Sequence, residues 1–380
     1  MGKAWRLGVL VAIGLAISLG IYRWLTPAPT KQAPEQQETV EAGLTLRDVT
    51  LQQPDENGVL LWRLQAETVT YSPDREVAVV TRPVSELFQD GEVIYNVTAD
   101  QGEILANGDR VFLRGNIVAT GVNNGSVLRG QELEWLPQED VLMMRRQITG
   151  THPQMRATAA EARVYNRQQR MELQGQVVAS TVVKDPKTEP WLKLQADQLV
   201  WLWEQEQVHS ESPLRVEQFK DKTITAVVTG RRGWVDLAKS VVTLQEAVTM
   251  DMLELPLQLV STAMEWRVTE QRVSVSQPLT VVHPKEKVRV TARQGQMDLK
   301  TQVVTLQGQV VALGERNQSR LTTDDLTWQV KEQRLVAQGQ VNYQQANPRL
   351  NLTGQRGVGQ LQDQTFRVDG APVVTEIQPN

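Results

Sequence analysis

The residues that most often carry chemistry in proteins are few and scattered in this chain. It contains three histidines, His152, His209 and His283, in unrelated sequence contexts, and no cysteine. No two of the histidines have the spacing of zinc ligands, and the sequence contains no phosphate-binding loop, nucleophile elbow or cysteine–histidine pair. The sequence therefore predicts no metal site and no catalytic site, and we expect a protein that is not an enzyme and has no cofactor.

Acidic residues are more numerous, but they recur at regular intervals. Asp100, Glu161, Asp197 and Asp324 each stand four residues before an apolar or aromatic residue of a recurring pattern. Carboxylates at turns and strand ends commonly accept hydrogen bonds from neighbouring groups of the chain. We therefore predict that these carboxylates form hydrogen bonds at turns or corners of a β structure.

The remaining chemistry is the binding of apolar ligands. Pairs of apolar and aromatic residues two positions apart recur along the chain, and residues at that spacing point to one face of a strand. Such a face either packs as an ordinary core between two sheets or lines a groove for acyl chains, which gain about 0.8 kcal/mol per buried methylene. The candidate lipid-binding residues are Leu133, Trp135, Leu199, Trp201, Trp234, Met264, Trp266, Leu326 and Trp328.

These residues belong to a repeated hairpin. In residues 323–341, Leu326 and Trp328 alternate with polar residues, 331–333 is a polar turn, and a second apolar arm follows with Gly339 inside it. This alternation with a polar break is typical of a half-buried β-hairpin. The positions equivalent to Trp328 recur at intervals of 30 to 36 residues, at Met297, Trp266, Trp234, Trp201, Tyr165, Trp135, Ile104 and Tyr71.

Glycine and proline recur at one phase of the second arm of the repeat. Either residue inside a strand marks a bulge or a bend, so the second strand of each repeat is expected to turn a corner between two sheets. The fold class that follows is all-β, an elongated β-jellyroll or taco-like structure of about ten hairpin-like repeats preceded by one transmembrane helix. The residues at this phase are Gly115, Gly175, Gly308, Gly339, Pro83, Pro213 and Pro278.

The amino terminus has the pattern of a membrane anchor. Residues 7–21 are apolar, and with the next few residues they approach the ~20 needed to span a bilayer. Lys3 and Arg6 favour a cytoplasmic amino terminus, and a cleaved signal peptide is the competing interpretation. A strip of small residues would allow another membrane helix to approach closely, and it consists of Gly8, Ala12, Ala16 and Gly20.

The domain organisation follows from these patterns. We expect an anchor at 1–25, a proline- and glutamine-rich tether at 26–41, and a β body whose halves, 42–186 and 187–380, stack on each other. The charged, proline-bearing segment Lys184–Pro190 suggests the division. The net charge of −4 is made of mixed charges, so nothing in the sequence indicates a nucleic-acid partner.

An anchor, a short tether and these repeats together resemble the LptC family, the membrane-anchored periplasmic component of the lipopolysaccharide export machinery. The resemblance implies a jellyroll that carries lipopolysaccharide or a related acylated glycolipid. It also implies an inner-membrane location with the body in the periplasm, an ABC transporter partner at the amino-terminal edge, and a further jellyroll partner at the carboxy-terminal edge. The motifs that carry the resemblance are LKLQADQLVW at 192–201, NVTADQGEI at 96–104, VFLRGNIVA at 111–119, MELQGQVVA at 171–179 and VTLQGQVVA at 304–312.

The body is longer than the resemblance implies. Either two modules are fused in it, or one long protein covers a distance that separate bridge subunits cover elsewhere. The alternative function, from a different class, is a membrane-anchored scaffold of β-repeats with a closed, dry core and no lipid ligand.

Overall fold

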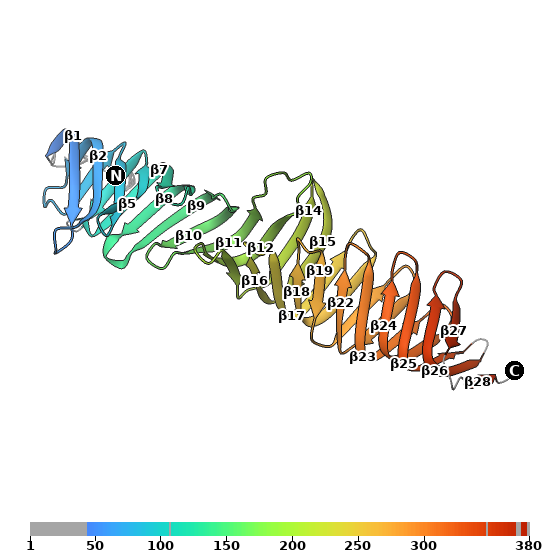
Figure 1. The fold of residues 1–380 in the computed structure, drawn as a ribbon. Coiled ribbons are helices and arrows are strands. Elements are labelled where there is room, and N and C mark those ends of the chain that lie inside the picture. Colours follow the sequence, from blue (N-terminus) through green and yellow to red (C-terminus); the bar gives the residue numbers. More distant parts are fainter. Residues whose placement is uncertain (1–43, 106–107, 347–348, 370–373, 378–380) are drawn as a thin grey trace, which may run out of the picture. The chain divides into compact units, whose positions relative to one another are not determined.

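Antiparallel strands that pair with their neighbours make up nearly all of the described chain (Figure 1). The computed structural model describes residues 44–105, 108–346, 349–369 and 374–377, the last range by its backbone only. Residues Thr45–Asn380 form one compact unit, distinct from Met1–Leu44. The predicted anchor, its small-residue strip and the tether lie outside the described residues. In the part of the chain that the structure describes, no helix is long and apolar enough to cross a membrane.

The predicted all-β body is confirmed, and its strands are of two kinds. Long strands run without interruption, and they are β1 (Thr45–Pro54), β2 (Leu60–Tyr71), β7 (Arg110–Gly121), β8 (Val127–Leu136), β9 (Val141–Thr151), β10 (Met155–Tyr165), β11 (Arg170–Thr181), β12 (Trp191–Leu202), β17 (Val241–Met252), β18 (Leu257–Arg267), β23 (Val303–Gly314), β24 (Ser319–Gln329), β25 (Arg334–Gln345) and β26 (Leu350–Gln360).

The other strands come as consecutive short pairs, each of which takes the place of one long strand. They are β3 (Val77–Thr81) with β4 (Val84–Gln89), β5 (Glu92–Thr98) with β6 (Gln101–Leu105), β13 (Gln207–Ser210) with β14 (Leu214–Lys220), β15 (Thr223–Gly230) with β16 (Arg232–Asp236), β19 (Arg272–Val275) with β20 (Leu279–His283), β21 (Val288–Ala292) with β22 (Gln294–Asp298), and β27 (Thr365–Asp369) with β28 (Val374–Ile377). A short 3-10 turn, Pro137–Glu139, joins β8 to β9.

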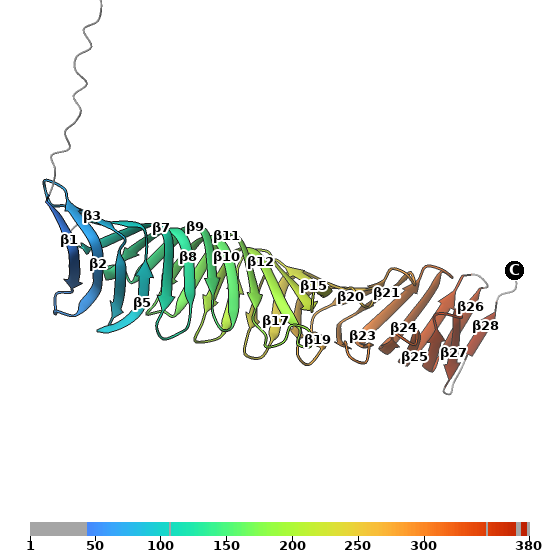
Figure 2. The same cartoon turned by 90° about the horizontal axis from the view of Figure 1, so that it is seen from above.

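Two layers result because each long strand contributes one half to each of them (Figure 2). The carboxy-terminal end of β12 pairs with β13, whereas its amino-terminal half pairs with β14. The two branches meet again on β17, which pairs with β16 through one half and with β15 through the other. We call the layer that contains β13 and β16 the Trp layer, because it holds Trp201, and the layer that contains β14 and β15 the opposite layer. The line along which the long strands pass from one layer to the other is called the corner.

Glycine bends a strand at the corner without breaking it. In β25, Gly339 and Gln340 both have positive φ, and the pairing register with β24 shifts at the same place. Gly115 in β7, Gly175 in β11 and Gly308 in β23 each begin an equivalent pair. Glycine adopts a positive φ without the steric cost that a side chain would impose. The bend predicted at these glycines is therefore confirmed, and the strand continues through it into the second layer.

Proline at the corner divides the strand instead. Pro83 lies between β3 and β4, Pro213 between β13 and β14, and Pro278 between β19 and β20. Proline has no backbone N–H to donate to a ladder, so strands are interrupted where it stands. Glycine at this phase thus accompanies one bent strand and proline accompanies two short ones, although β9 and β17 bend at Arg146–Gln147 and Glu246–Ala247 without a glycine.

Of the four acidic residues that the sequence analysis predicted to form hydrogen bonds at corners, Asp100 and Glu161 do so through their carboxylates. The Asp100 carboxylate accepts a hydrogen bond from Asn116 Nδ2 at 2.8 Å, which ties β7 to the junction of β5 and β6. Glu161 forms ion pairs with Arg145 and Arg163 at 3.4 and 2.7 Å. Thr323, next to Asp324, bonds through its hydroxyl to the Gln338 and Gly339 carbonyls. These contacts fix neighbouring strands at the bend.

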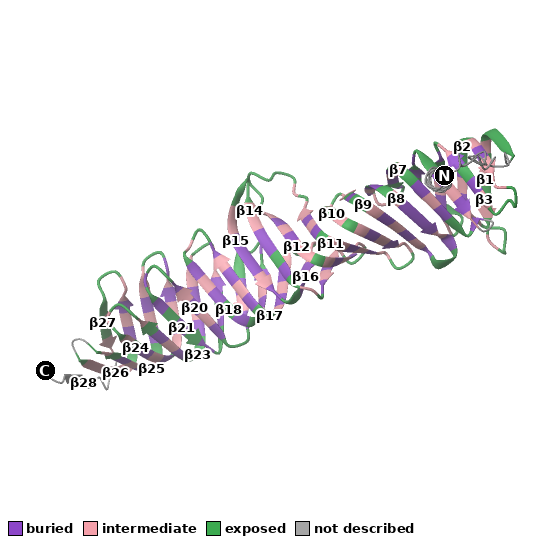
Figure 3. Ribbon diagram, turned by 180° about the vertical axis from the view of Figure 1, so that it is seen from behind, coloured by how far each residue is buried: buried purple, intermediate pink, exposed green. Residues whose placement is uncertain are grey.

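The core lies between the two layers and runs along the body (Figure 3). On β17, Val242 and Leu244 face it from the Trp layer, and Val248 and Met250 face it from the opposite layer, all of them at most 1% exposed. β17 has a β-bulge at the corner, between Gln245 and Val248, and inward-facing residues alternate with outward-facing ones on both sides of it. A single apolar interior therefore follows the whole ladder of strands.

Candidate functional site

The recurring tryptophans occupy one register position of the Trp layer. Each residue of this line is the direct pairing partner of the next one, on the adjacent strand. In the middle of the body, every fourth residue of the line is a tryptophan. We call the line the Trp row. Its members are Tyr71, Ala78, Ile104, Val111, Trp135, Leu142, Val164, Met171, Trp201, Val208, Val235, Val242, Trp266, Val273, Met297, Val304, Trp328, Leu335, Gly359 and Phe366.

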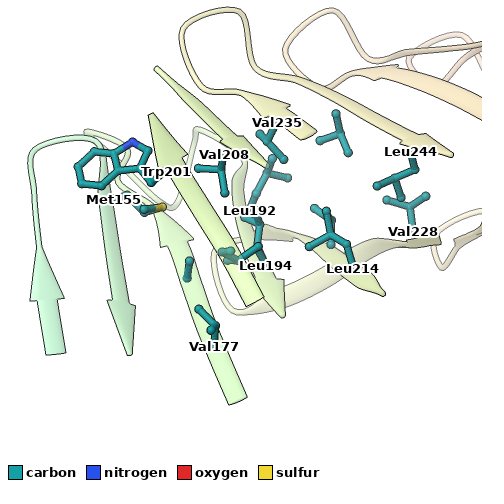
Figure 4. Packing of buried hydrophobic residues seen from close by; sticks show 14 of the residues in the cluster. Met155, Val177, Leu192, Leu194, Trp201, Val208, Leu214, Val228, Val235 and Leu244 are labelled. Atoms are coloured by element: carbon teal, nitrogen blue, oxygen red, sulfur yellow. The ribbon is translucent and has the colours of Figure 1, made fainter. Parts of the chain in front are cut away.

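Eight of the nine candidate residues face the interior. The row tryptophans are almost fully buried, from 4% exposed at Trp201 to 0% at Trp328. The other four candidates lie two residues before the tryptophans on the same strands, which places them nearer to the corner. They are buried as deeply as the tryptophans, and they are Leu133, Leu199, Met264 and Leu326. Figure 4 shows Trp201 beside Met155, which comes from the opposite layer. The structure thus brings these eight side chains onto one continuous apolar wall.

Trp234 is the exception, and the sequence alignment at this position was one residue out of register. Val235 pairs with Val208 on one side and with Val242 on the other, so Val235 belongs to the Trp row. Because neighbouring residues of a strand point to opposite faces, Trp234 lies on the outer face, half-buried beside His209 at 6.5 Å between ring centroids. The same correction replaces Tyr165 by Val164 in the row. Alignment on aromatic residues fails where the inward position is aliphatic.

The indole N–H groups of the row tryptophans are a feature that sequence reasoning missed. In Trp135, Trp201, Trp266 and Trp328, the buried indole nitrogen has no hydrogen-bond partner among the described residues. Two tryptophans outside the row do have partners: Trp62 Nε1 donates to the Gly108 carbonyl at 3.0 Å, and Trp191 Nε1 donates to the Asp221 carbonyl at 3.1 Å. The unpaired donors are therefore a property of the row.

Opposite the corner, the hairpin turns of the two layers face each other along a line that we call the seam. Side chains span it: Trp62 bonds to Gly108 as above, and Gln154 bonds to Glu206. Gln333 Nε2 reaches Glu286 Oε1 at 3.5 Å. The corner, in contrast, is crossed by the backbone itself. The two layers are thus joined covalently along one side and by side-chain contacts along the other.

Two histidines pack against row tryptophans at the seam, contrary to the expectation that the histidine contexts are unrelated. His152 meets Trp201 edge-on, with ring centroids 4.7 Å apart and planes at 70°. His283 lies 5.9 Å from Trp328. Each histidine precedes its tryptophan by a similar distance in the sequence, 49 and 45 residues, which is the signal that could have revealed the pairing.

The surroundings of both seam histidines disfavour protonation of the imidazole. His152 Nδ1 accepts a hydrogen bond from the backbone N–H of Gln154, and His283 Nδ1 accepts one from the backbone N–H of Glu286, both at 3.2 Å. Burial lowers the pKa of each imidazole below its ordinary value, and the carboxylates of Glu206 and Glu286 oppose this effect in part. Within the described ranges, no group of acidic or histidine side chains could hold a metal ion.

The residues of the chain match the family model of LptC-related lipopolysaccharide assembly over 9–182 and 254–370. The chain belongs to this LptC-related family. No curated protein was found to match it. Among solved structures, it is similar to LptH from Pseudomonas aeruginosa, described as the LptA homologous periplasmic component of the conserved lipopolysaccharide transport device, with 16% identity, a TM-score of 0.30, and coverage of 33% of this chain and 97% of that one.

The LptC-related match leaves out 183–253, and this stretch continues the same architecture. It contains β12 to β17, and the Trp row passes through it at Trp201, Val208, Val235 and Val242 without a change of register. The stretch begins with the segment that sequence reasoning singled out, Lys184–Pro190, which carries the chain from β11 to β12. The additional strands lengthen the ladder and do not interrupt its interior.

Among the described residues of this LptC-related chain, the two layers pack closely on each other at Trp201 and near the carboxy-terminal end. A cavity of about 20 Å³ lies against Trp201 and Met155, and one of about 70 Å³ lies near Tyr343 and Phe366. Sites for small ligands usually measure about 300–1,000 Å³. At the seam, a hollow of about 240 Å³ is lined by residues of both layers, among them Gln154, Leu192 and Val235. A hollow of about 600 Å³ is lined mostly by polar residues, among them Glu265 and Gln296, together with Met264. The two small cavities cannot hold an acyl chain unless the layers around them move apart.

Proposed function

We propose that the chain is a periplasmic bridge for lipopolysaccharide or a related acylated glycolipid, with acyl chains held between the Trp layer and the opposite layer. The observation that carries the proposal is the unbroken Trp row, which extends one apolar wall across the body in a member of the LptC-related family. A lipid that slides along such a wall exchanges one set of apolar neighbours for an equivalent set. This arrangement suits transport better than a single deep pocket would.

Lipid reaches the interior through the seam. Separating the layers at the corner would require the backbone of the long strands to break, whereas at the seam it requires only side-chain interactions to be exchanged. Acyl chains that enter replace the apolar packing of one layer on the other with packing against their own methylenes, each of which contributes about 0.8 kcal/mol when buried.

The two ends of the ladder are the contact surfaces for partners. Among the described residues, β1 at the amino-terminal end pairs with β2 only, and its Leu46 is 37% exposed. At the carboxy-terminal end, β27 and β28 pair with β26 only, again within the described part of the chain. An open strand edge is a template for strand addition. With the anchor in the inner membrane, the β1 edge would join the periplasmic part of the ABC transporter, and the β27–β28 edge would join a jellyroll on the outer-membrane side.

The competing function is a scaffold whose core never opens, and the complete burial of Trp328 is the observation that favours it. A photo-crosslinking residue in place of Trp201 or Trp328 separates the two. For a lipid bridge we expect capture of acylated lipid in cells at both row positions and none at Glu332, which lies in an exposed turn. Equal labelling at all three positions, or labelling at none of them, would decide for the scaffold.

A further inference from the structure

The four unpaired indole donors recur with the period of the fold. Each of Trp135, Trp201, Trp266 and Trp328 lies four strands further along the Trp layer than the one before it. At a spacing of about 4.8 Å between neighbouring strands, this places one donor roughly every 19 Å along the row. All four nitrogens are buried and lack a partner among the described residues.

A buried donor without a partner is unfavourable, because it has lost its bonds to water and gained nothing in return. Folded proteins contain few such groups, and each calls for an explanation. One unpaired indole could be an accident of packing. Four at equivalent places, in a chain whose Trp62 and Trp191 do bond through their indoles, indicate a role that recurs with the repeat.

The wall around these donors defines the chemistry of a suitable acceptor. The row residues beside Trp201 are Met171 and Val208, and those beside Trp266 are Val242 and Val273. A phosphate or carboxylate would be buried there without a cation, at a large cost, because burial lowers the pKa of the histidines beside Trp201 and Trp328 and so disfavours their charged form. A hydroxyl or an amide would bring a donor of its own that the apolar wall cannot satisfy. An ester carbonyl is an acceptor only, so it fits without leaving a second polar group unpaired.

We propose that the four indoles are hydrogen-bond stations for the ester carbonyl groups of acyl chains held in the interior. This inference rests on the proposed function, since it assigns the polar contacts of the same lipid. Equivalent stations at a constant spacing give a lipid similar binding energy at each step. A carrier with such stations favours no single position along its length, and movement in one direction then depends on supply at one end and removal at the other.

The test compares two probes that differ only in the carbonyl. Full-length protein with ¹⁵N-labelled tryptophan, kept in an alkyl maltoside that contains no ester, is titrated with dimyristoyl phosphatidylglycerol or with its dialkyl ether analogue. We expect the indole ¹H resonances of the four row tryptophans to move downfield with the ester probe and not with the ether. The indoles of Trp62 and Trp191, which already have acceptors, are the internal controls. Resonances are assigned with single Trp→Phe variants.

Affinity gives a second readout. The ester probe should bind about two- to tenfold more tightly than the ether probe, the range expected for one hydrogen bond. A variant with all four row tryptophans changed to Phe should bind the two probes equally, and Trp191→Phe should keep the preference. Equal binding of both probes to the wild-type chain, with unchanged indole resonances, would refute the hydrogen bonds between indoles and ester carbonyls. The proposal that the chain is a lipid bridge would be unaffected. Binding of neither probe would overturn both.

Discussion

Gly339 lies directly against Asp324 at the corner between β24 and β25. A Cβ atom built on Gly339 would stand 2.5 Å from Asp324 Oδ2, closer than real side chains approach one another, and the φ of Gly339 is +78°. Gly115 has the same relationship to Asp100, again at 2.5 Å. At both corners the backbone of the bent strand therefore packs against the carboxylate in space that a side chain would need.

Gly339→Ala should be clearly destabilising. A positive φ costs a residue with a Cβ about 1–2 kcal/mol, and forcing an atom into filled space costs about 1–3 kcal/mol more. Gly58→Ala is the matched control, because Gly58 has a φ of +82° but no atom within 4 Å of the added Cβ. Urea unfolding midpoints of the two variants measure the difference. Equal losses would mean that the contact with Asp324 is unimportant, and Asp324→Gly should partly rescue Gly339→Ala.

Trp328→Ala should cost about 3–5 kcal/mol of stability, as truncations of large buried aromatic residues do. Trp191→Ala should cost much less, because Trp191 is only half-buried, although it stacks on Phe219 at 4.2 Å. Chemical unfolding of both variants checks this. If the two losses were the same, the Trp row would not be the main core of the body.

Covalent closure of the seam should block the uptake of lipid. The native chain has no cysteine, so Gln154→Cys with Glu206→Cys, and Gln333→Cys with Glu286→Cys, can be linked by a short reducible reagent without side products. We expect uptake of a fluorescent acylated probe to fall severalfold after linking and to recover on reduction. Arg63→Cys with Glu86→Cys, a pair within the opposite layer, is the control that should leave uptake unchanged. Undiminished uptake in the linked seam variant would exclude loading between the layers.

The His283 contact with Trp328 should make stability depend on pH. Burial lowers the pKa of His283, with smaller contributions from Lys285 and Arg316 in the same direction and from Glu286 in the opposite one. As pH falls through the ordinary histidine pKa of about 6.5, the unfolded chain binds the proton before the folded chain does, so the folded state loses stability. His283→Gln should lose less between pH 7.5 and 5.5 than the wild type. Equal losses of stability in the wild type and in His283→Gln, measured by thermal or urea unfolding, would contradict this.

Val368→Pro should disrupt the distal contact only. Leu361 donates its N–H to the Gln333 carbonyl of the preceding hairpin, and the alternation of an antiparallel ladder then directs the Val368 amide to the open edge of β27. Proline removes that donor. We expect crosslinks from β27 to an outer-membrane-side partner to be lost, and crosslinks from β1 to the transporter to persist. A distal crosslink at the wild-type yield, or loss of the proximal one, would refute the proposed polarity.

The sequence by itself determined the local structure of this protein. Apolar alternation, polar turns and a recurring glycine or proline specify hairpins that bend at one phase, because strand period and backbone conformation are properties of a few adjacent residues. The inward positions of Leu326 and Trp328 followed from the same alternation. The family resemblance also followed from sequence motifs, and the match over 9–182 and 254–370 confirms it.

Tertiary structure decided what depends on partners far apart in the chain. Val235, not Trp234, belongs to the Trp row because strand register is set by β13 and β17 on either side. His152 and Trp201 meet because the two layers face each other across the seam. The unpaired indoles are likewise visible only once the surroundings of each nitrogen are known. A dry core and a lipid groove require the same apolar alternation, so only the packing of one layer on the other could reveal how closely the two layers meet.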